Sequence, residues 1–230
     1  MQPVEVSVVI PCYNAGRYIG EAIESVLCQA GGAFQIIIID DGSTDNSLAV
    51  ARSFGKKVEI YSQTNSGQSA ARNAGIQKAR HPLLAFIDAD DLWPEHSLAA
   101  RLEALSAAPD AECVFGAVQQ FASPDMDGAR ARTLNIDETP MVARFAGTML
   151  IQRAAFLRAG PFDPTLRIGE MIEWLARAQL AGIAMTSINR VVLKRRVHGT
   201  NTVLTDTNAQ AGYLRALKAG LDRRRAAIGR

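Results

Sequence analysis

Cysteine is scarce in this sequence and long apolar runs are missing, and each scarcity excludes a class of protein. The three cysteines (Cys12, Cys28 and Cys113) are an odd number without zinc-ligand spacing, which argues against disulfides and against a zinc site. No apolar run approaches the roughly 18 residues that span a bilayer. The N-terminus passes directly into a strand-like run without a charged leader, so we expect a cytoplasmic protein.

The composition is that of a folded protein with one domain, or one domain and a tail. Of the 230 residues, 48% are hydrophobic and 21% are charged. The net charge of +2 conceals an asymmetry, since residues 190–230 contain ten Lys and Arg against two acids, whereas residues 1–189 contain 15 against 21. A basic C-terminal segment is most often a solvated helix face, and contact with phosphates or an anionic membrane stays open.

Apolar strand-like runs alternate with helical patterns along the first half of the chain. The predicted strands are residues 6–10, 34–39, 58–61 and 83–87, and helical spacing begins at Ile19, near Leu48 and at Ser69. The runs are continuously apolar, which is typical of strands buried on both faces. We therefore predict an α/β fold with a mostly parallel, Rossmann-like sheet flanked by helices on both faces.

The segment Asp88-Ala89-Asp90-Asp91, called the acidic turn below, follows the fourth predicted strand directly. Three carboxylates at one strand end repel one another, and a divalent cation is the usual remedy. The alternative is a solvated turn before a helix, with Pro94 and Glu95 in its first turn.

Polar residues also follow the other predicted strands, at Tyr13-Asn14, Asp40-Asp41 and Asn65. Ligands of parallel sheets bind beyond the carboxyl ends of the strands. Four polar segments at one edge of the sheet therefore favour a ligand site over a chance surface feature.

The motifs at these strand ends resemble a known family. They are Pro11-x-Tyr13-Asn14, Asp40-Asp41-Gly-Ser-Thr-Asp45, Asn65-x-Gly67-x-x-x-Ala71-Arg72-Asn73-x-Gly75 and the acidic turn. In this order and spacing they resemble the donor-binding half of family-2 glycosyltransferases, which have the GT-A fold. The resemblance implies an inverting transfer of sugar from a nucleotide-diphosphate sugar to a hydroxyl, with Mn²⁺ or Mg²⁺.

The resemblance also implies roles for single residues. Those assigned to the nucleotide-sugar are Pro11 and Tyr13 in the base pocket, Asn14 beside them, Asp41 or Asp40 as acceptor for a uracil or thymine imide, Arg72 near the nucleotide, and Asp88 and Ala89. Asp88 would meet the ribose or a metal-bound water. Asp90 would bind the cation directly, and we assign Asp91 a structural role.

The catalytic base is expected in the segment Gly169 to Trp174. Many relatives carry an Asp base where this chain has Met171. Glu170 and Glu173 lie three apart on a predicted helix and share a face, so either can reach the acceptor hydroxyl. We favour Glu170, because Glu173 also has the spacing to pair with Arg177.

Residues 194–201 follow a predicted strand at 191–193 and resemble a flexible loop of the family. In relatives a histidine here completes the metal site, which gives His198 that role, while Arg195 and Arg196 would hold phosphate oxygens in a lid. We expect a glycosyltransferase domain over residues 1–205, with a donor half at 1–121, a mobile loop at 123–139 and an acceptor half at 140–205, followed by a basic helix at 206–230.

Two other functions stay open. A sugar nucleotidyltransferase needs a glycine-rich basic loop, which the segment 11–16 does not provide, and Met171 leaves room for a nucleotide-sugar-binding protein without activity. The acceptor can be a glycan, a lipid-linked sugar, a peptide or a small molecule. We expect no nucleic-acid partner, and a homodimer or peripheral membrane contact by the basic helix stays open.

Overall fold

A computed structural model describes residues 4–124, 126, 134, 136–199 and 209–228. Its strands are β1 (Val4–Cys12), β2 (Gly32–Asp40), β3 (Glu59–Ser62), β4 (Leu83–Phe86), β5 (Cys113–Ala122), β6 (Met141–Val142), β7 (Met149–Gln152) and β8 (Met185–Val197). Its helices are α1 (Ile19–Leu27), α2 (Ser47–Arg52), α3 (Gln68–Lys78), α4 (Ser97–Ala107), α6 (Arg153–Ala159), α7 (Glu170–Leu180) and α9 (Ala209–Ile228), with 3₁₀ turns η1 (Gly55–Lys57) and η2 (Ala146–Thr148). Parts of the predicted loop at 123–139 and of the predicted lid lie outside the described residues.

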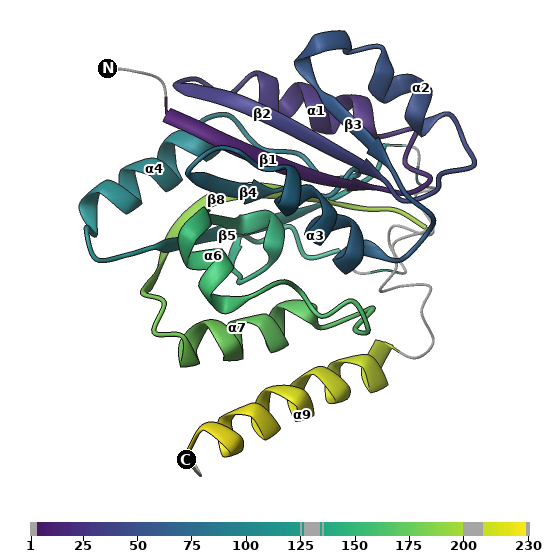
Figure 1. Ribbon diagram of the computed structural model, residues 1–230. Coiled ribbons are helices and arrows are strands. Elements are labelled where there is room, and N and C mark those ends of the chain that lie inside the picture. Colours follow the sequence, from purple (N-terminus) through teal and green to yellow (C-terminus); the bar gives the residue numbers. More distant parts are fainter. Residues whose placement is uncertain (1–3, 125, 127–133, 135, 200–208, 229–230) are drawn as a thin grey trace.

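One sheet runs through the described chain in the order β3-β2-β1-β4-β7-β5-β6, with β8 beside β5 (Figure 1). The first four strands are mutually parallel. β7 is antiparallel to both β4 and β5, and β8 is parallel to β5. The carboxyl end of β8 therefore points the same way as those of β1 to β4, which confirms the mostly parallel sheet.

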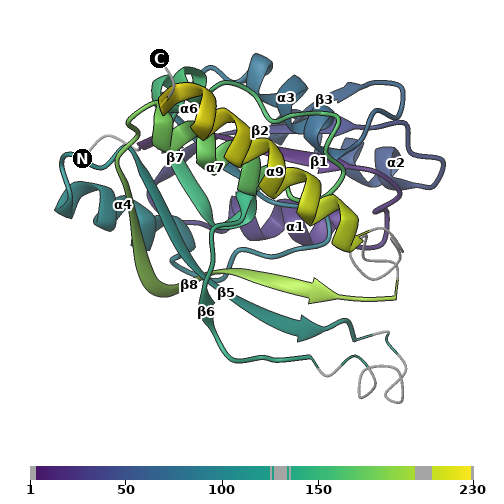
Figure 2. The ribbon, with the colours of Figure 1, turned by 90° about the horizontal axis from the view of Figure 1, so that it is seen from below.

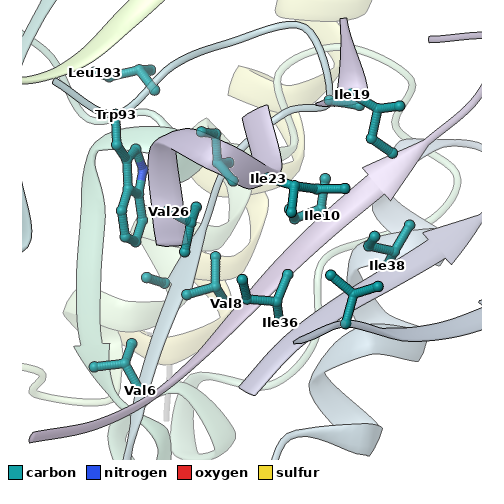
Figure 3. Close-up of a cluster of buried hydrophobic side chains, with 14 of the residues drawn as sticks. Val6, Val8, Ile10, Ile19, Ile23, Val26, Ile36, Ile38, Trp93 and Leu193 are labelled. Atoms are coloured by element: carbon teal, nitrogen blue, oxygen red, sulfur yellow. The ribbon is translucent and has the colours of Figure 1, made fainter. Parts of the chain in front are cut away.

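Helices cover both faces of this sheet, and this explains why its strands are continuously apolar. Val6, Val8 and Ile10 point to one face, where they pack with α1, α2 and α4 (Figure 3). Val9 and Ile37 point to the other face, toward α3, α6 and α7. Both faces of the sheet are dry, as the sequence predicts for a parallel sheet.

Several boundaries differ from the predicted ones. β1 continues through Pro11 to Cys12. The Val9 carbonyl is the last of β1 to accept a bond on the β4 side, so the missing N–H of Pro11 faces no paired strand. α4 starts at Ser97 and not near Pro94, because His96 before it has a φ of 63°.

The N-cap residue of α2 is Asn46. One further prediction about local structure is wrong. Lys194 and its two following arginines belong to β8 and not to a loop, since β8 continues to Val197 beside β5. The division of the chain into two halves and a C-terminal helix stays a prediction. None of the described helices has the length and apolar content needed to cross a membrane.

Candidate active site

Four polar segments meet at the carboxyl ends of parallel strands. Tyr13 and Asn14 follow β1, Asp40 ends β2 and Asp41 follows it. The acidic turn follows β4, and His198 follows β8. The parallel direction of these strands places all four segments at one edge of the sheet.

The loops after β1 and β2 bond to each other. Asn14 has a φ of 48°, its N–H donates to Ser43 Oγ at 3.0 Å, and its Oδ1 accepts the Thr44 N–H at 2.8 Å. The Gly16 N–H donates to Asp45 Oδ2 at 3.0 Å. These bonds fix the loops around the site independently of any ligand.

Asp41 organises the loop after β3. It is only 3% exposed; its Oδ1 accepts the Gln63 side-chain amide at 2.7 Å and the Ser66 N–H at 2.9 Å, and its Oδ2 accepts the Gly67 N–H at 2.8 Å. A carboxylate has about four lone-pair sites, so these bonds leave room for one more donor. Asp40 Oδ1 accepts the Ser43 N–H at 3.1 Å.

An aromatic ring and a buried proline lie beside these carboxylates. Pro11 is buried near the end of β1, whereas Tyr13 is 52% exposed. Ala89 in the acidic turn is buried. The exposed ring offers a flat apolar surface on which a planar base can stack.

The acidic turn gathers its three carboxylates in one place. Ligand oxygens of Asp88, Asp90 and Asp91 lie within 4.8 Å of one another. Burial raises the pKa of Asp91 well above its usual range, and the charges of Asp90 and Asp88 raise it further. Asp91 also accepts the Arg196 N–H at 2.9 Å. Such hard oxygen donors fit Mg²⁺ or Mn²⁺.

His198 lies against the acidic turn. Its Nε2 is 2.9 Å from Asp90 Oδ2, and its ring stacks on Tyr18 with centroids 4.9 Å apart. Two residues 108 positions apart in the sequence, both assigned to a metal, are thus neighbours. Tyr18 had not been singled out in the sequence, where an aromatic residue just before α1 is the only signal of it.

Strand β8 is fastened to the acidic turn by backbone bonds. The Leu92 N–H donates to the Lys194 carbonyl at 2.9 Å, and the Leu92 carbonyl accepts the Lys194 N–H at 2.8 Å. Arg196 donates through Nε to the Asp90 carbonyl at 2.9 Å and through Nη2 to Glu21 Oε2 at 2.6 Å. These contacts hold the turn in shape from outside.

Arg196 is built into the protein and does not lie on a mobile lid. It is 2% exposed, and its guanidinium lies 4.9 Å from the ring centroids of Tyr18 and Phe121. Arg195 is half-buried, with its guanidinium 5.9 Å from the centre of the Phe145 ring. Of the two predicted phosphate ligands, Arg195 is therefore the more accessible.

Arg72 joins the acidic turn to α7. It is 3% exposed and donates through Nη2 to Asp88 at 2.7 Å and through Nη1 to Glu170 at 2.9 Å. Burial alone would lower the pKa of Arg72, but the charges of Asp88 and Glu170 outweigh it and raise the pKa. Beside it, Asn73 exchanges two bonds with the Phe162 backbone, at 2.8 and 2.9 Å.

The two candidate glutamates have different surroundings, contrary to the expected shared face. Glu173 is fully buried and bonded by Arg177 from two nitrogens, each at 2.8 Å, and by Arg223 of α9 at 2.8 Å. Glu170 meets Arg72 instead. Met171 between them is 6% exposed in the apolar core. Within the part of the chain that the structure describes, Arg72 thus connects Glu170, and not Glu173, to the acidic turn.

The chain is similar in sequence to known glycosyltransferases. The family model described as Glycosyl transferase family 2 matches residues 7–165. An uncharacterised glycosyltransferase of Rickettsia typhi is 27% identical over 221 residues, covering 90% of this chain and 69% of that protein. The uncharacterised glycosyltransferase YibD of Escherichia coli is 46% identical over 90 residues, 38% of this chain and 26% of that protein.

The solved structures that resemble the chain include TarS of S. aureus. The structure of its residues 1–349 in complex with UDP-GlcNAc has a TM-score of 0.74 at 15% identity, over 94% of this chain and 65% of that one. The complex with UDP has a TM-score of 0.68 at 18% identity, over 96% of this chain and 71% of that one. The likeness is in fold, and this chain has the GT-A arrangement of a central sheet flanked by helices.

Proposed function

This chain belongs to glycosyl transferase family 2, and from that premise we propose that it is a metal-dependent, inverting glycosyltransferase. It would move a sugar from a UDP- or dTDP-sugar to an acceptor hydroxyl. The chain spans only part of several relatives, so this proposal concerns the domain in hand.

The proposal rests on the two hydrogen bonds that Arg72 donates to two different carboxylates. One guanidinium holds both Asp88 of the acidic turn and Glu170 at the start of α7. Donor and acceptor groups of a transferase must face each other across one reacting carbon. A rigid, charged link between the acidic turn and a carboxylate meets that need.

The base of the nucleotide would stack on Tyr13 beside Pro11 and donate its imide N–H to Asp41. The lone-pair site that Asp41 keeps after its three internal bonds supports this assignment. A carboxylate here attracts uracil or thymine, whose N3–H is a donor, and repels a base with only acceptors at that position. The TarS complexes with UDP and UDP-GlcNAc support a uridine donor for this chain.

Asp90 and His198 would hold the cation, with Asp88 close by. Bound there, Mn²⁺ or Mg²⁺ would neutralise the charge that develops on the departing diphosphate. Glu170 would take the proton of the acceptor hydroxyl as that oxygen attacks the anomeric carbon. Arg72 would hold Glu170 in position, since its Nη1 donates to the Glu170 carboxylate at 2.9 Å.

Buried Met171 favours a second function, that of a nucleotide-sugar-binding protein without transferase activity. Relatives carry an Asp base at this position, and here a thioether lies in the core. In that case the donor site would be intact while Glu170 served only to neutralise Arg72.

Donor hydrolysis and donor binding, measured together, separate the two functions. We expect slow Mn²⁺-dependent release of UDP from at least one UDP-sugar of a panel. Glu170→Gln should lower that turnover by about 10²–10⁴-fold and leave the donor Kd nearly unchanged. Tight donor binding without turnover, in the wild-type chain as in Glu170→Gln, would favour the binding function. A loss of turnover of this size in Glu173→Gln, and not in Glu170→Gln, would assign the base to Glu173.

A further inference from the structure

The outward face of α9 is apolar. Leu214, Leu217 and Leu221 are 67%, 48% and 52% exposed, and Tyr213 is 39% exposed. A spacing of three and four residues puts the three leucines on one side of the helix. α9 lies outside α7: it is below α7 in Figure 1 and in front of it in Figure 2, where the molecule is seen from below.

The opposite face of α9 is fixed to the domain. Gly212 and Gly220 pack so closely that an added Cβ would lie 3.2 Å from Ile168 and from Ala176 respectively. The pair between Arg223 and buried Glu173 adds a polar link. Because this inner face is closely packed, the leucines point outward in a defined orientation.

The charge of α9 selects among possible occupants. Residues 209–228 contain five Lys and Arg and one acid, so the helix has a formal charge of +4. Exposed Arg215 and Lys218 lie on the same helix as the leucines. A second copy would bring one +4 helix against another, which like-charge repulsion opposes. An anionic surface complements both the cations and the leucine stripe.

We propose that α9 binds the surface of an anionic lipid bilayer. The leucines would enter the boundary between headgroups and acyl chains, and Arg215 and Lys218 would stay among the lipid phosphates. The long helix therefore lies on the membrane and does not cross it, in keeping with its charge.

Helix α9, which carries this surface, packs beside the proposed active site through its inner face. An added Cβ at Gly169, the residue before Glu170, would meet Ala216 at 2.7 Å and Tyr213 at 3.6 Å. Membrane binding itself does not depend on the proposed function. A further step rests on the proposed function: the position of α9 beside the site favours an acceptor held at a membrane surface.

Vesicle sedimentation of the whole chain tests the proposal without any activity measurement. The probes are vesicles of phosphatidylcholine alone and of phosphatidylcholine mixed with phosphatidylglycerol. We expect binding to the anionic vesicles that weakens with salt, and little binding to the neutral ones. Leu217→Asn with Leu221→Asn should reduce binding at least about tenfold, since each buried leucine contributes strongly.

Matched variants control for exposure and charge. Leu157→Asn with Leu180→Asn changes leucines that are 53% and 46% exposed on other helices, and should leave binding unchanged. Arg215→Ser with Lys218→Ser should weaken binding by about fivefold for each cation. Lys56→Ser with Lys57→Ser, on η1, should not weaken it.

Thermal unfolding of each variant separates misfolding from lost binding. The proposal is overturned if the wild-type chain stays in the supernatant with anionic vesicles, or if both leucine pairs lower binding equally. It is also overturned if sedimentation velocity shows a dimer that Leu217→Asn with Leu221→Asn dissociates, because the face would then be covered by a second copy.

Discussion

Glu170 accepts a bond from Arg72 at 2.9 Å, and the same guanidinium donates to Asp88 at 2.7 Å. These residues belong to α7, α3 and the acidic turn, so one buried cation fixes the relative positions of three segments. The Nε of Arg72 is also buried and has no hydrogen-bond partner in the part of the chain that the structure describes. Arg72 therefore positions two carboxylates, although one of its own N–H groups makes no hydrogen bond there.

Arg72→Met should therefore destabilise the protein and reduce turnover together. It leaves two carboxylates partly buried without their cation, which we expect to cost about 2–4 kcal/mol of unfolding free energy. Urea unfolding measures this. The control is Arg80→Met, which breaks an exposed pair with Glu59 and should cost less than about 1 kcal/mol. Equal losses of unfolding free energy in the two variants would contradict a larger contribution of buried Arg72 to stability.

Asp90→Asn should abolish metal-dependent binding of UDP. In the wild-type chain UDP with Mn²⁺ should raise the Tm, because a ligand that binds only the folded state stabilises it, and excess chelator should remove the increase. In the variant the Tm should not respond to Mn²⁺. Asp110→Asn, an exposed change after α4, is the control. A Mn²⁺ response that survives in Asp90→Asn would show that Asp90 is not a ligand of the proposed metal site.

Glu173→Ala should affect stability more than chemistry. It leaves Arg177 and Arg223 without their shared carboxylate, at an expected cost of about 2–4 kcal/mol. Amide hydrogen exchange in α9 should accelerate, because one of its links to α7 is lost. Turnover per folded molecule should stay close to that of the wild-type chain, unlike that of Glu170→Gln.

Thiol reactivity should distinguish the three cysteines. Cys28 is exposed, whereas burial raises the pKa of the Cys12 thiol to about 11 and also raises that of Cys113. A raised pKa keeps a thiol protonated and unreactive until the pH approaches it. At pH 8 we expect one fast-reacting thiol, lost in Cys28→Ser, and three after unfolding. Rapid native reaction of a second thiol would contradict this.

Gly75→Ala should be destabilising although alanine is the better helix former. An added Cβ would lie 2.4 Å from Val9 Cγ1, since α3 packs closely on β1. We expect a loss of about 1–3 kcal/mol in unfolding free energy. Gly20→Ala, in α1 with its nearest contact at 3.6 Å, is the matched control and should be neutral or stabilising.

Most of the fold could be predicted from the sequence, because strands buried on both faces leave a local apolar pattern. Continuous apolar runs such as residues 34–39 reveal strands buried on both faces, and the polar residues after them mark the edge where ligands bind. These signals are local. The acidic turn is visible in the sequence in the same way, and His198, named there by resemblance alone, lies 2.9 Å from Asp90 in the structure.

The sequence did not contain the contacts that depend on tertiary packing. Spacing alone put Glu170 and Glu173 on one face, but it could not show that α9 would supply Arg223 to the second of them. The burial of Arg196 between two aromatic rings likewise depends on β8 lying beside β5. Partners from distant segments leave no periodic signal in either of the segments they join.

The backbone bridge between Leu92 and Lys194 also bears on how the protein folds. It joins segments about a hundred residues apart, and contacts of such separation form late because a large loop must close first. A chain still emerging from the ribosome could pair β1 to β4 before β8 exists. We expect the acidic turn and His198 to come together last, so that binding of UDP with Mn²⁺ to the proposed site would report completion of folding.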